Sequence, residues 1–175
     1  MRALVVGGGC RALALARELV ADGHAVRVVT RRPERRAAIE AAGAECWIGD
    51  PDVVGTLRYA LDHVTVLLWL LGTASGGADG AASVAELHGP RLRMLLEKST
   101  DTTVRGVVYE VRGTVDRAVL ATGAEEVRRA HRVNEIPYAL LDADPADREA
   151  WLTAAREAIG SLLSPHRGAA QPALS

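Results

Sequence analysis

The feature that most constrains the fold is a glycine-rich turn directly after the first apolar run of the chain. Residues 2–6 read Arg-Ala-Leu-Val-Val, and Gly7-Gly-Gly-Cys-Arg-Ala12 follows before a segment with apolar residues at helical spacing. The turn fits the pattern G-x-G-x-x-A between a strand and a helix. In that context Gly7 makes the tight turn, Gly9 leaves room for a pyrophosphate, and Ala12 lets the helix pack closely on the strand. The alternative is a turn that only connects the two elements.

Strand and helix patterns alternate along the rest of the chain. We expect strands at 2–6, 25–30, 45–48, 64–71, 104–111 and 136–141, and helices at 10–21, 34–42, 53–61, 82–98, 115–132 and 145–163. The strands are continuous apolar runs, which is typical of a parallel sheet covered on both faces. Right-handed crossovers then predict a single doubly wound Rossmann-type α/β domain over residues 1–163, with strand order 3-2-1-4-5-6. Residues 164–175 show no periodicity, and we expect a disordered tail there.

Composition limits the classes of partner. The chain has 175 residues, 49% of them hydrophobic, and a net charge of −1, so one globular domain is expected, with no concentrated positive field for nucleic acid or an anionic membrane. The most apolar run, residues 64–71, is too short for a bilayer, which needs about 20 residues. Two cysteines, Cys10 and Cys46, and the absence of a secretory leader before the first strand predict a cytoplasmic protein.

The end of the second expected strand bears on the choice of cofactor. NAD-binding domains usually carry an acid there for the ribose 2′-hydroxyl, whereas this strand ends in Thr30-Arg31-Arg32. Guanidinium groups bind a 2′-phosphate and a carboxylate repels it, so these residues favour NADP(H) over NAD(H), which stays possible. Arg35 and Arg36 add to the positive field. The alternative is a solvated arginine cluster at the start of a helix.

Further cofactor contacts are expected where other elements meet the same edge of the sheet. Asp50 follows the third strand and either caps the next helix or contacts the adenine. Residues 72–80 follow the fourth strand as a Gly/Ala/Ser-rich loop, either a lid or a loose connection. The expected contacts beyond the glycines and the basic cluster are Cys10, Arg11, Asp50, Leu71 and Gly72.

With these residues in view, the chain resembles the short-chain dehydrogenase/reductase superfamily, in particular its atypical, NmrA-like NAD(P)-binding members. The resemblance covers about residues 1–142 and rests on the glycine turn, the basic end of strand two, Gly49-Asp50, and strand five running into Tyr109. The glycine spacing differs from the longer GxxGxxG of many extended members. The resemblance implies a substrate pocket beyond strands four to six and NADP(H) bound by Gly7, Gly9, Arg31, Arg32 and Asp50.

Catalytic members of that superfamily use a Tyr-x-x-x-Lys pair, in which the lysine lowers the pKa of the tyrosine. This chain has no such pair. The residues four positions after its three tyrosines, Tyr59, Tyr109 and Tyr138, are His63, Gly113 and Asp142, and its one lysine, Lys98, follows Met94 by four. Tyr109, at the end of the fifth expected strand, lies where catalytic groups of that superfamily are expected and is the one candidate acid. A packed tyrosine is the alternative.

The remaining chemistry is sparse. The five histidines lack the spacing of a metal site, so no metal is expected. The sequence therefore predicts a non-catalytic NADP(H)-binding or redox-sensing protein, whose partners are the dinucleotide and either a small molecule or a partner protein. An NADP(H)-dependent oxidoreductase acting on a small organic substrate is the alternative. A Rossmann module that binds nothing is disfavoured by the intact glycine turn.

Overall fold

A six-stranded, all-parallel sheet in the order β3-β2-β1-β4-β5-β6 forms the centre of the molecule, as predicted. The computed structural model describes residues 1–76 and 80–164, so the expected tail lies outside the described residues apart from Ser164. The strands are β1 (Arg2–Gly7), β2 (Ala25–Thr30), β3 (Glu45–Ile48), β4 (Val66–Leu70), β5 (Gly106–Glu110) and β6 (Tyr138–Leu141). The helices are α1 (Gly9–Ala21), α2 (Arg36–Ala41), α3 (Gly80–His88), α4 (Pro90–Ser99), α5 (Arg117–Asn134) and α6 (Arg148–Leu163).

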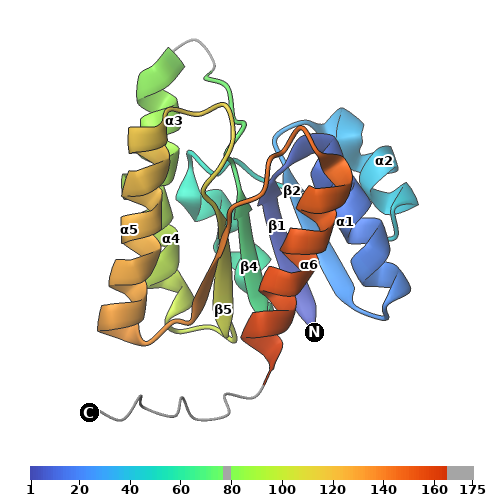
Figure 1. Ribbon diagram of the computed structural model, residues 1–175. Coiled ribbons are helices and arrows are strands. Elements are labelled where there is room, and N and C mark those ends of the chain that lie inside the picture. Colours follow the sequence, from blue (N-terminus) through green and yellow to red (C-terminus); the bar gives the residue numbers. More distant parts are fainter. Residues whose placement is uncertain (77–79, 165–175) are drawn as a thin grey trace, which may run out of the picture.

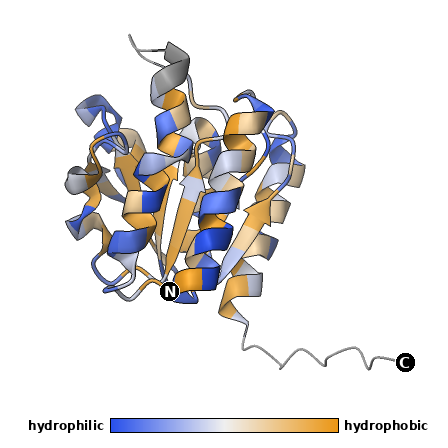
Figure 2. Cartoon of the chain, turned by 90° about the vertical axis from the view of Figure 1, so that its left-hand side faces the viewer, coloured by the Kyte–Doolittle hydropathy of each residue, from blue (hydrophilic) through white to orange (hydrophobic). Residues whose placement is uncertain are grey.

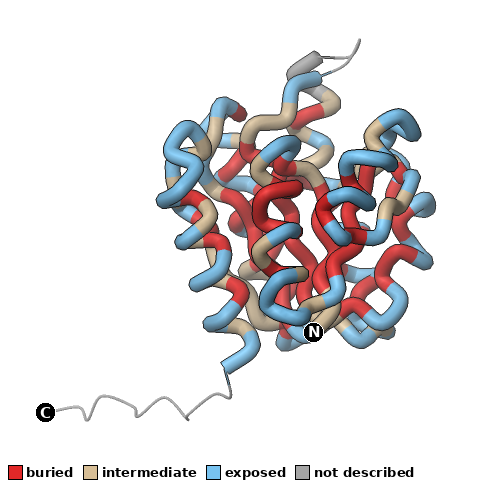
Figure 3. The backbone as a smooth tube through the Cα atoms, turned by 90° about the vertical axis from the view of Figure 1, so that its right-hand side faces the viewer, coloured by how far each residue is buried: buried red, intermediate tan, exposed pale blue. Residues whose placement is uncertain are grey.

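Helices cover both faces of this sheet (Figure 1). One core lies between the sheet and α1, α2 and α6, and includes Val5 and Leu68; the other lies toward α4 and α5, and includes Leu4 and Trp69. Neighbouring residues of one strand thus enter opposite cores, which is why the strands read as unbroken apolar runs. Figure 2 shows the apolar strands behind the helices on one side, and Figure 3 shows the buried inner surfaces of the helices on the other. In the described part of the chain, no helix has the length and apolarity to span a bilayer.

Helix α6 illustrates how local sequence positions a side chain of the site. The Asp147 carboxylate accepts a hydrogen bond from the Ala150 N–H at 3.1 Å and begins the helix. Trp151, Ala155 and Ile159 follow at intervals of four residues and are all buried in the α1-side core. This stripe fixes the rotation of α6 and turns the Trp151 indole toward the carboxyl end of the sheet.

The expected helix at 53–61 is wrong. The segment forms two short 3₁₀ turns, Val54–Leu57 and Tyr59–Leu61. Thr56 explains the difference, because its hydroxyl lies 2.8 Å from the Asp50 N–H and 2.8 Å from the Val53 carbonyl and so competes with helical bonding. Gly55 lowers the helix propensity further. The expected helix at 34–42 likewise begins as a 3₁₀ turn, Pro33–Arg35, before α2.

The expected helix at 82–98 is two helices, α3 and α4, divided at Gly89-Pro90. Proline has no N–H for an intrahelical bond and its ring clashes with the preceding turn, so it is tolerated only in the first turn of a helix. Pro90 accordingly begins α4, and Gly89 adopts a non-helical conformation with φ −116° and ψ −102°. The break lets α3 extend beyond the carboxyl edge of the sheet, next to the candidate site.

Candidate functional site

The glycine turn between β1 and α1 adopts a conformation that ordinary side chains rarely reach. Gly7, Gly8 and Gly9 have φ values of 85°, 80° and 53°. A Cβ on Gly7 would collide with the Leu70 carbonyl oxygen, so this position needs glycine for close packing of β1 against the end of β4. A Cβ on Gly9 would meet no atom within 4 Å. Gly9 therefore faces open space, which leaves its backbone accessible from the pocket side.

The first turn of α1 presents free backbone donors to that space. The Gly8 carbonyl accepts the Arg11 and Ala12 N–H groups at 3.0 and 3.2 Å. The Gly9 and Cys10 N–H groups precede these residues, where a helix has no internal acceptor. The first turn contains no acidic residue to compensate the positive end of the helix dipole. Such an end binds anions, phosphate in particular.

A pocket of about 330 Å³ opens beside this turn, at the carboxyl ends of β1, β2 and β4. Its size falls in the usual range of small-molecule sites. Around the glycines it has two chemically different sides. One, from β2 and β3, contains the charged side chains Arg31, Arg32, Arg35, Asp50 and Asp52. The other, from the end of β4 and from α3, contains small hydroxyl-bearing and apolar residues: Leu71, Thr73, Ala74, Ser75, Ser83, Val84 and Leu87.

The arginines of the β2 side carry charge that the protein does not neutralise. Arg31 and Arg32 are exposed and Arg35 is half-buried, and none of the three forms an ion pair with a described residue. Their backbone is nevertheless ordered, because the Thr30 hydroxyl accepts the Arg32 N–H at 3.1 Å. Thr30 thus shapes the turn that presents the cationic groups.

The two acids of the pocket differ in how they are paired. Asp52 forms an ion pair with Arg91 at 3.0 Å, and Arg91 also contacts Glu86 at 2.9 Å, which ties the β3 loop to the helical layer. Asp50 instead accepts the Asp52 N–H at 2.9 Å and closes the turn after β3. Asp50 therefore closes this turn and lines the pocket. It does not cap a following helix, because that segment forms 3₁₀ turns, and its contact with an adenine stays a prediction.

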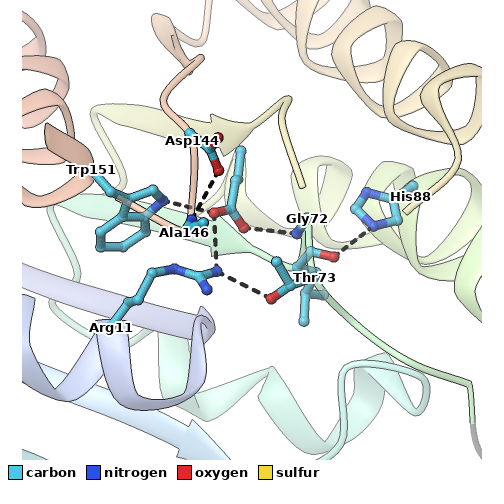
Figure 4. Close-up of polar contacts among 9 residues, drawn as sticks. Arg11, Gly72, Thr73, His88, Asp144, Ala146 and Trp151 are labelled. Carbon is cyan, nitrogen blue, oxygen red and sulfur yellow. Dashed lines mark hydrogen bonds and ion pairs between the residues drawn. The ribbon is translucent and has the colours of Figure 1, made fainter. Parts of the chain in front are cut away.

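Behind the β4 side of the pocket lies a buried carboxylate, Glu110, at the end of β5. It accepts hydrogen bonds from the Gly72 N–H at 2.8 Å, the Trp151 indole N–H at 2.8 Å and the Arg11 guanidinium at 3.2 Å. Arg11 also donates to the Thr73 hydroxyl at 3.1 Å and stacks over the Trp151 ring at 5.1 Å (Figure 4). This set, Glu110 with Arg11 and Trp151, is called the Glu110 cluster below.

Tyr109 does not face the pocket. Its side chain is fully buried, and its ring lies against Gly123 of α5, where a Cβ would collide with the hydroxyl. The hydroxyl donates to His88 Nδ1 at 2.6 Å, and the Leu120 carbonyl oxygen is 3.1 Å away. Burial, and secondarily the charge of Glu110, raise the pKa of Tyr109 far above its ordinary value. Tyr109 is therefore a packed core residue and is not placed to donate a proton to a ligand in the pocket.

His88 connects the buried Tyr109 hydroxyl to Leu71 in the pocket wall. Its Nε2 lies 3.1 Å from the Leu71 carbonyl oxygen, which can only accept, so Nε2 carries the proton and Nδ1 accepts from Tyr109. Burial lowers the pKa of His88 below 6.5, against an opposing contribution from the bond to Leu71. The imidazole is therefore neutral in the folded protein near neutral pH.

This lowered pKa predicts a loss of stability in mild acid. The unfolded chain binds a proton at His88 below about pH 6.5 and the folded chain does not, so the free energy of unfolding falls as the pH drops below that value. The limiting slope for one group is about 1.4 kcal/mol per pH unit. Urea denaturation from about pH 7.5 to about pH 5.5 measures the slope. We expect His88→Gln to have a shallower slope; an identical slope would contradict this assignment.

The residues that the sequence predicted as cofactor contacts fall into two groups. Those lining the pocket are Gly7, Gly9, Thr30, Arg31, Arg32, Asp50 and Leu71. Those outside its lining are Cys10, which is exposed, Ala12, which is packed beneath the turn, and Arg11 and Gly72, which bind Glu110.

Sequence reasoning missed the roles of two residues behind the pocket wall, Glu110 and Trp151. The one signal in the sequence was an acid ending an otherwise apolar strand, Gly106-Val-Val-Tyr-Glu110. An acid is almost never fully buried without a partner, so its presence there called for a cation from elsewhere in the chain.

Among residues 1–76 and 80–164, no group of His, Cys, Asp and Glu side chains is arranged to hold a metal ion.

Comparison with known proteins places the fold. No family model and no curated sequence matches the chain. A short-chain dehydrogenase/reductase superfamily protein from Agrobacterium tumefaciens, with bound NAD, matches with a TM-score of 0.66 and 19% identity over 80% of this chain and 48% of its own. UDP-glucose 4-epimerase from Thermotoga maritima, with UDP-glucose, matches with a TM-score of 0.66 and 16% identity over 80% and 54%.

A third solved structure is similar: dTDP-glucose 4,6-dehydratase from Streptomyces venezuelae, with NAD and TYD bound, has a TM-score of 0.61 and 20% identity over 80% of this chain and 54% of its own. The chain thus spans about half the length of these proteins. At such identities the likeness establishes the fold alone, a doubly wound Rossmann-type α/β fold.

Proposed function

We propose that this chain binds NADP(H) in the pocket beside its glycine turn, as an atypical, NmrA-like member of the short-chain dehydrogenase/reductase superfamily working in the cytoplasm. The observation that carries the proposal is the combination of an open Gly9, free N–H groups at the start of α1 and unpaired arginines in one pocket. The Gly9 and Cys10 amides would bind the pyrophosphate. Asp50 would face the adenine, and the Leu71–Thr73 segment would flank the nicotinamide half.

Charge supports NADP(H) over NAD(H). The two cofactors differ by the 2′-phosphate on the adenosine ribose, and Arg31 and Arg32 follow β2, the strand that supplies contacts to this ribose in the fold. Among the described residues, no acid ends this strand to accept a 2′-hydroxyl, and no ion pair competes for the two guanidinium groups. Guanidinium groups bind phosphate with two parallel hydrogen bonds, so they supply both charge and geometry.

The distribution of ionisable groups supports a binding or redox-sensing role without catalysis. When bound, NADP(H) supplies hydride chemistry, and a carbonyl substrate would also need a proton donor. Among the described lining residues, the ionisable ones lie on the β2 and β3 side, and the β4 side offers the hydroxyls of Thr73, Ser75 and Ser83. We therefore propose that the chain's own residues bind and orient the dinucleotide and move no proton.

The double substitution Arg31→Ala/Arg32→Ala tests the choice of cofactor. Each charge-assisted hydrogen bond contributes about 1.5–3 kcal/mol, so the loss of both arginines is expected to weaken NADPH binding by about 100-fold or more. NADH binding should change by less than about threefold, because the arginines contact a group that NADH lacks. Isothermal titration calorimetry of both cofactors measures the two effects.

The matched control is Arg36→Ala. Arg36 belongs to the same basic stretch but forms an i,i+4 ion pair with Glu40 and does not line the pocket, so its loss should leave NADPH affinity within about twofold. Equal loss of NADPH and NADH affinity in the double variant would contradict the 2′-phosphate assignment. Steady NADPH oxidation on addition of carbonyl or quinone acceptors would instead favour the oxidoreductase.

A further inference from the structure

We propose that the Glu110 cluster is a positioning device that holds the Leu71–Ala74 segment as a rigid wall of the pocket, in fixed register with the glycine turn. The inference rests on the proposed function, because the wall matters only if a ligand spans both sides of the pocket. Neither Glu110 nor Trp151 lines the pocket, so both act through the segment that they hold.

The Leu71–Ala74 segment is bound by four different parts of the protein. The Leu71 carbonyl accepts from His88 of α3 and from the Ala74 N–H at 3.0 Å. The Gly72 N–H donates to Glu110, and the Gly72 carbonyl accepts the Val115 N–H at 3.0 Å. The Thr73 hydroxyl accepts from Arg11. Residues 72–74, the first part of the loop 72–80 that the sequence allowed as a lid, are fixed in this way and are not adjustable. Residues 77–79 of that loop lie outside the described residues.

Glu110 is the centre of this arrangement because it collects donors from three elements. Its carboxylate binds Gly72 after β4, Arg11 of α1 and Trp151 of α6, and its side chain is fully buried. A buried charge is costly unless it is paired and fully hydrogen-bonded. The folded state therefore strongly favours the one arrangement in which all three donors reach the carboxylate.

Arg11 makes the cluster specific to the pocket. It lies two residues after Gly9, so the side chain that binds Glu110 and Thr73 comes from the helical turn whose amides face the pocket. The cluster thereby joins the phosphate-facing turn and the β4-side wall into one rigid unit. Holding both binding surfaces in place before the ligand arrives removes the ordering cost from binding.

The test compares two ligands that differ in what they touch. NADPH spans both sides of the pocket, whereas adenosine 2′,5′-bisphosphate carries the adenosine, the 2′-phosphate and one 5′-phosphate for the glycine turn, and lacks the nicotinamide half that would meet the β4 side. In Glu110→Gln, one side-chain atom becomes a donor that faces the donors of the cluster, so NADPH affinity should fall by about tenfold or more. Affinity for the bisphosphate should change by less than about twofold. Trp151→Phe keeps an aromatic ring, although a smaller one, and removes the indole N–H donor, and should weaken NADPH binding by about threefold.

Amide hydrogen exchange gives a readout that needs no ligand. In Trp151→Phe we expect faster exchange at residues 71–75 and unchanged exchange at residues 30–32, because only the first segment depends on the cluster. The control is Arg156→Met, which removes the ion pairs to Glu18 and Asp22 at the other end of the same α1–α6 interface. It should alter neither NADPH affinity nor exchange at residues 71–75.

The outcomes separate the inference from the proposed function. Failure of wild-type protein to bind either ligand would contradict the proposed function itself. If wild-type protein binds both, equal losses for NADPH and the bisphosphate in Glu110→Gln and Trp151→Phe would overturn the positioning role. Unchanged exchange at residues 71–75 in Trp151→Phe would overturn it as well.

Discussion

Replacing Gly9 with aspartate will abolish NADPH binding while leaving the protein folded. The new carboxylate would occupy the open space beside the Gly9 and Cys10 amides, where the pyrophosphate is proposed to bind. It would therefore both fill the phosphate site and repel the phosphate groups of the ligand. We expect affinity to fall by at least about 100-fold. The cost to folding is small, roughly 1–2 kcal/mol for a positive φ, because no atom lies within 4 Å of the new Cβ and aspartate tolerates this conformation. Calorimetric titration and a thermal melt measure the two quantities.

The matched control for this substitution is Gly55→Asp. Gly55 is exposed, has no atom within 4 Å of an added Cβ and does not line the pocket, so the same charge is added without reaching the ligand. Its NADPH affinity should stay within about twofold of wild type. Near-wild-type NADPH binding by a folded Gly9→Asp protein would show that the glycine turn is not the phosphate site.

The largest effect on stability is expected from Gly113→Ala. A Cβ on Gly113 would overlap the Gly72 carbonyl group, and both are backbone positions that cannot turn aside like a side chain. The loops after β4 and β5 would have to separate, which we expect to cost about 3 kcal/mol or more in the free energy of unfolding. Urea denaturation followed by circular dichroism measures the change.

Gly160→Ala provides the comparison. Gly160 lies within α6, is exposed, and has no atom within 4 Å of an added Cβ, so alanine there should stabilise the protein by about 0.5–1 kcal/mol. A lower free energy of unfolding in Gly113→Ala together with a higher one in Gly160→Ala would support the close approach of the loops after β4 and β5. A Gly113→Ala protein as stable as wild type would contradict it.

The fold was predictable because its signals are local. Apolar runs and glycine or proline punctuation mark the strands, and right-handed crossovers limit the order in which a parallel sheet can form. The failures were also local, and their causes were visible in the sequence. Pro90 ends one helix and begins another, and Thr56 diverts the backbone of its segment into 3₁₀ turns.

The site was predictable on one side only. Gly9, Arg31 and Arg32 follow strands at spacings that the fold itself fixes, so their places in the pocket could be inferred. The opposite side depends on contacts between Glu110 and residues far away in the chain, 99 positions for Arg11 and 41 for Trp151. No periodicity encodes such pairs, and Arg11 was therefore assigned to the ligand although its partner is a buried acid.

The most direct test of the central claim is a titration of ¹⁵N-labelled protein with NADPH, followed by amide NMR. We predict that the largest shifts occur at Gly8, Gly9 and Cys10, with further shifts at Thr30 to Arg32, while residues 152–160 along the outer groove between α1 and α6 stay unchanged. Saturation without shifts in the glycine turn would contradict binding at this site. No shifts with NADPH or NADH at millimolar concentration would contradict dinucleotide binding by this chain.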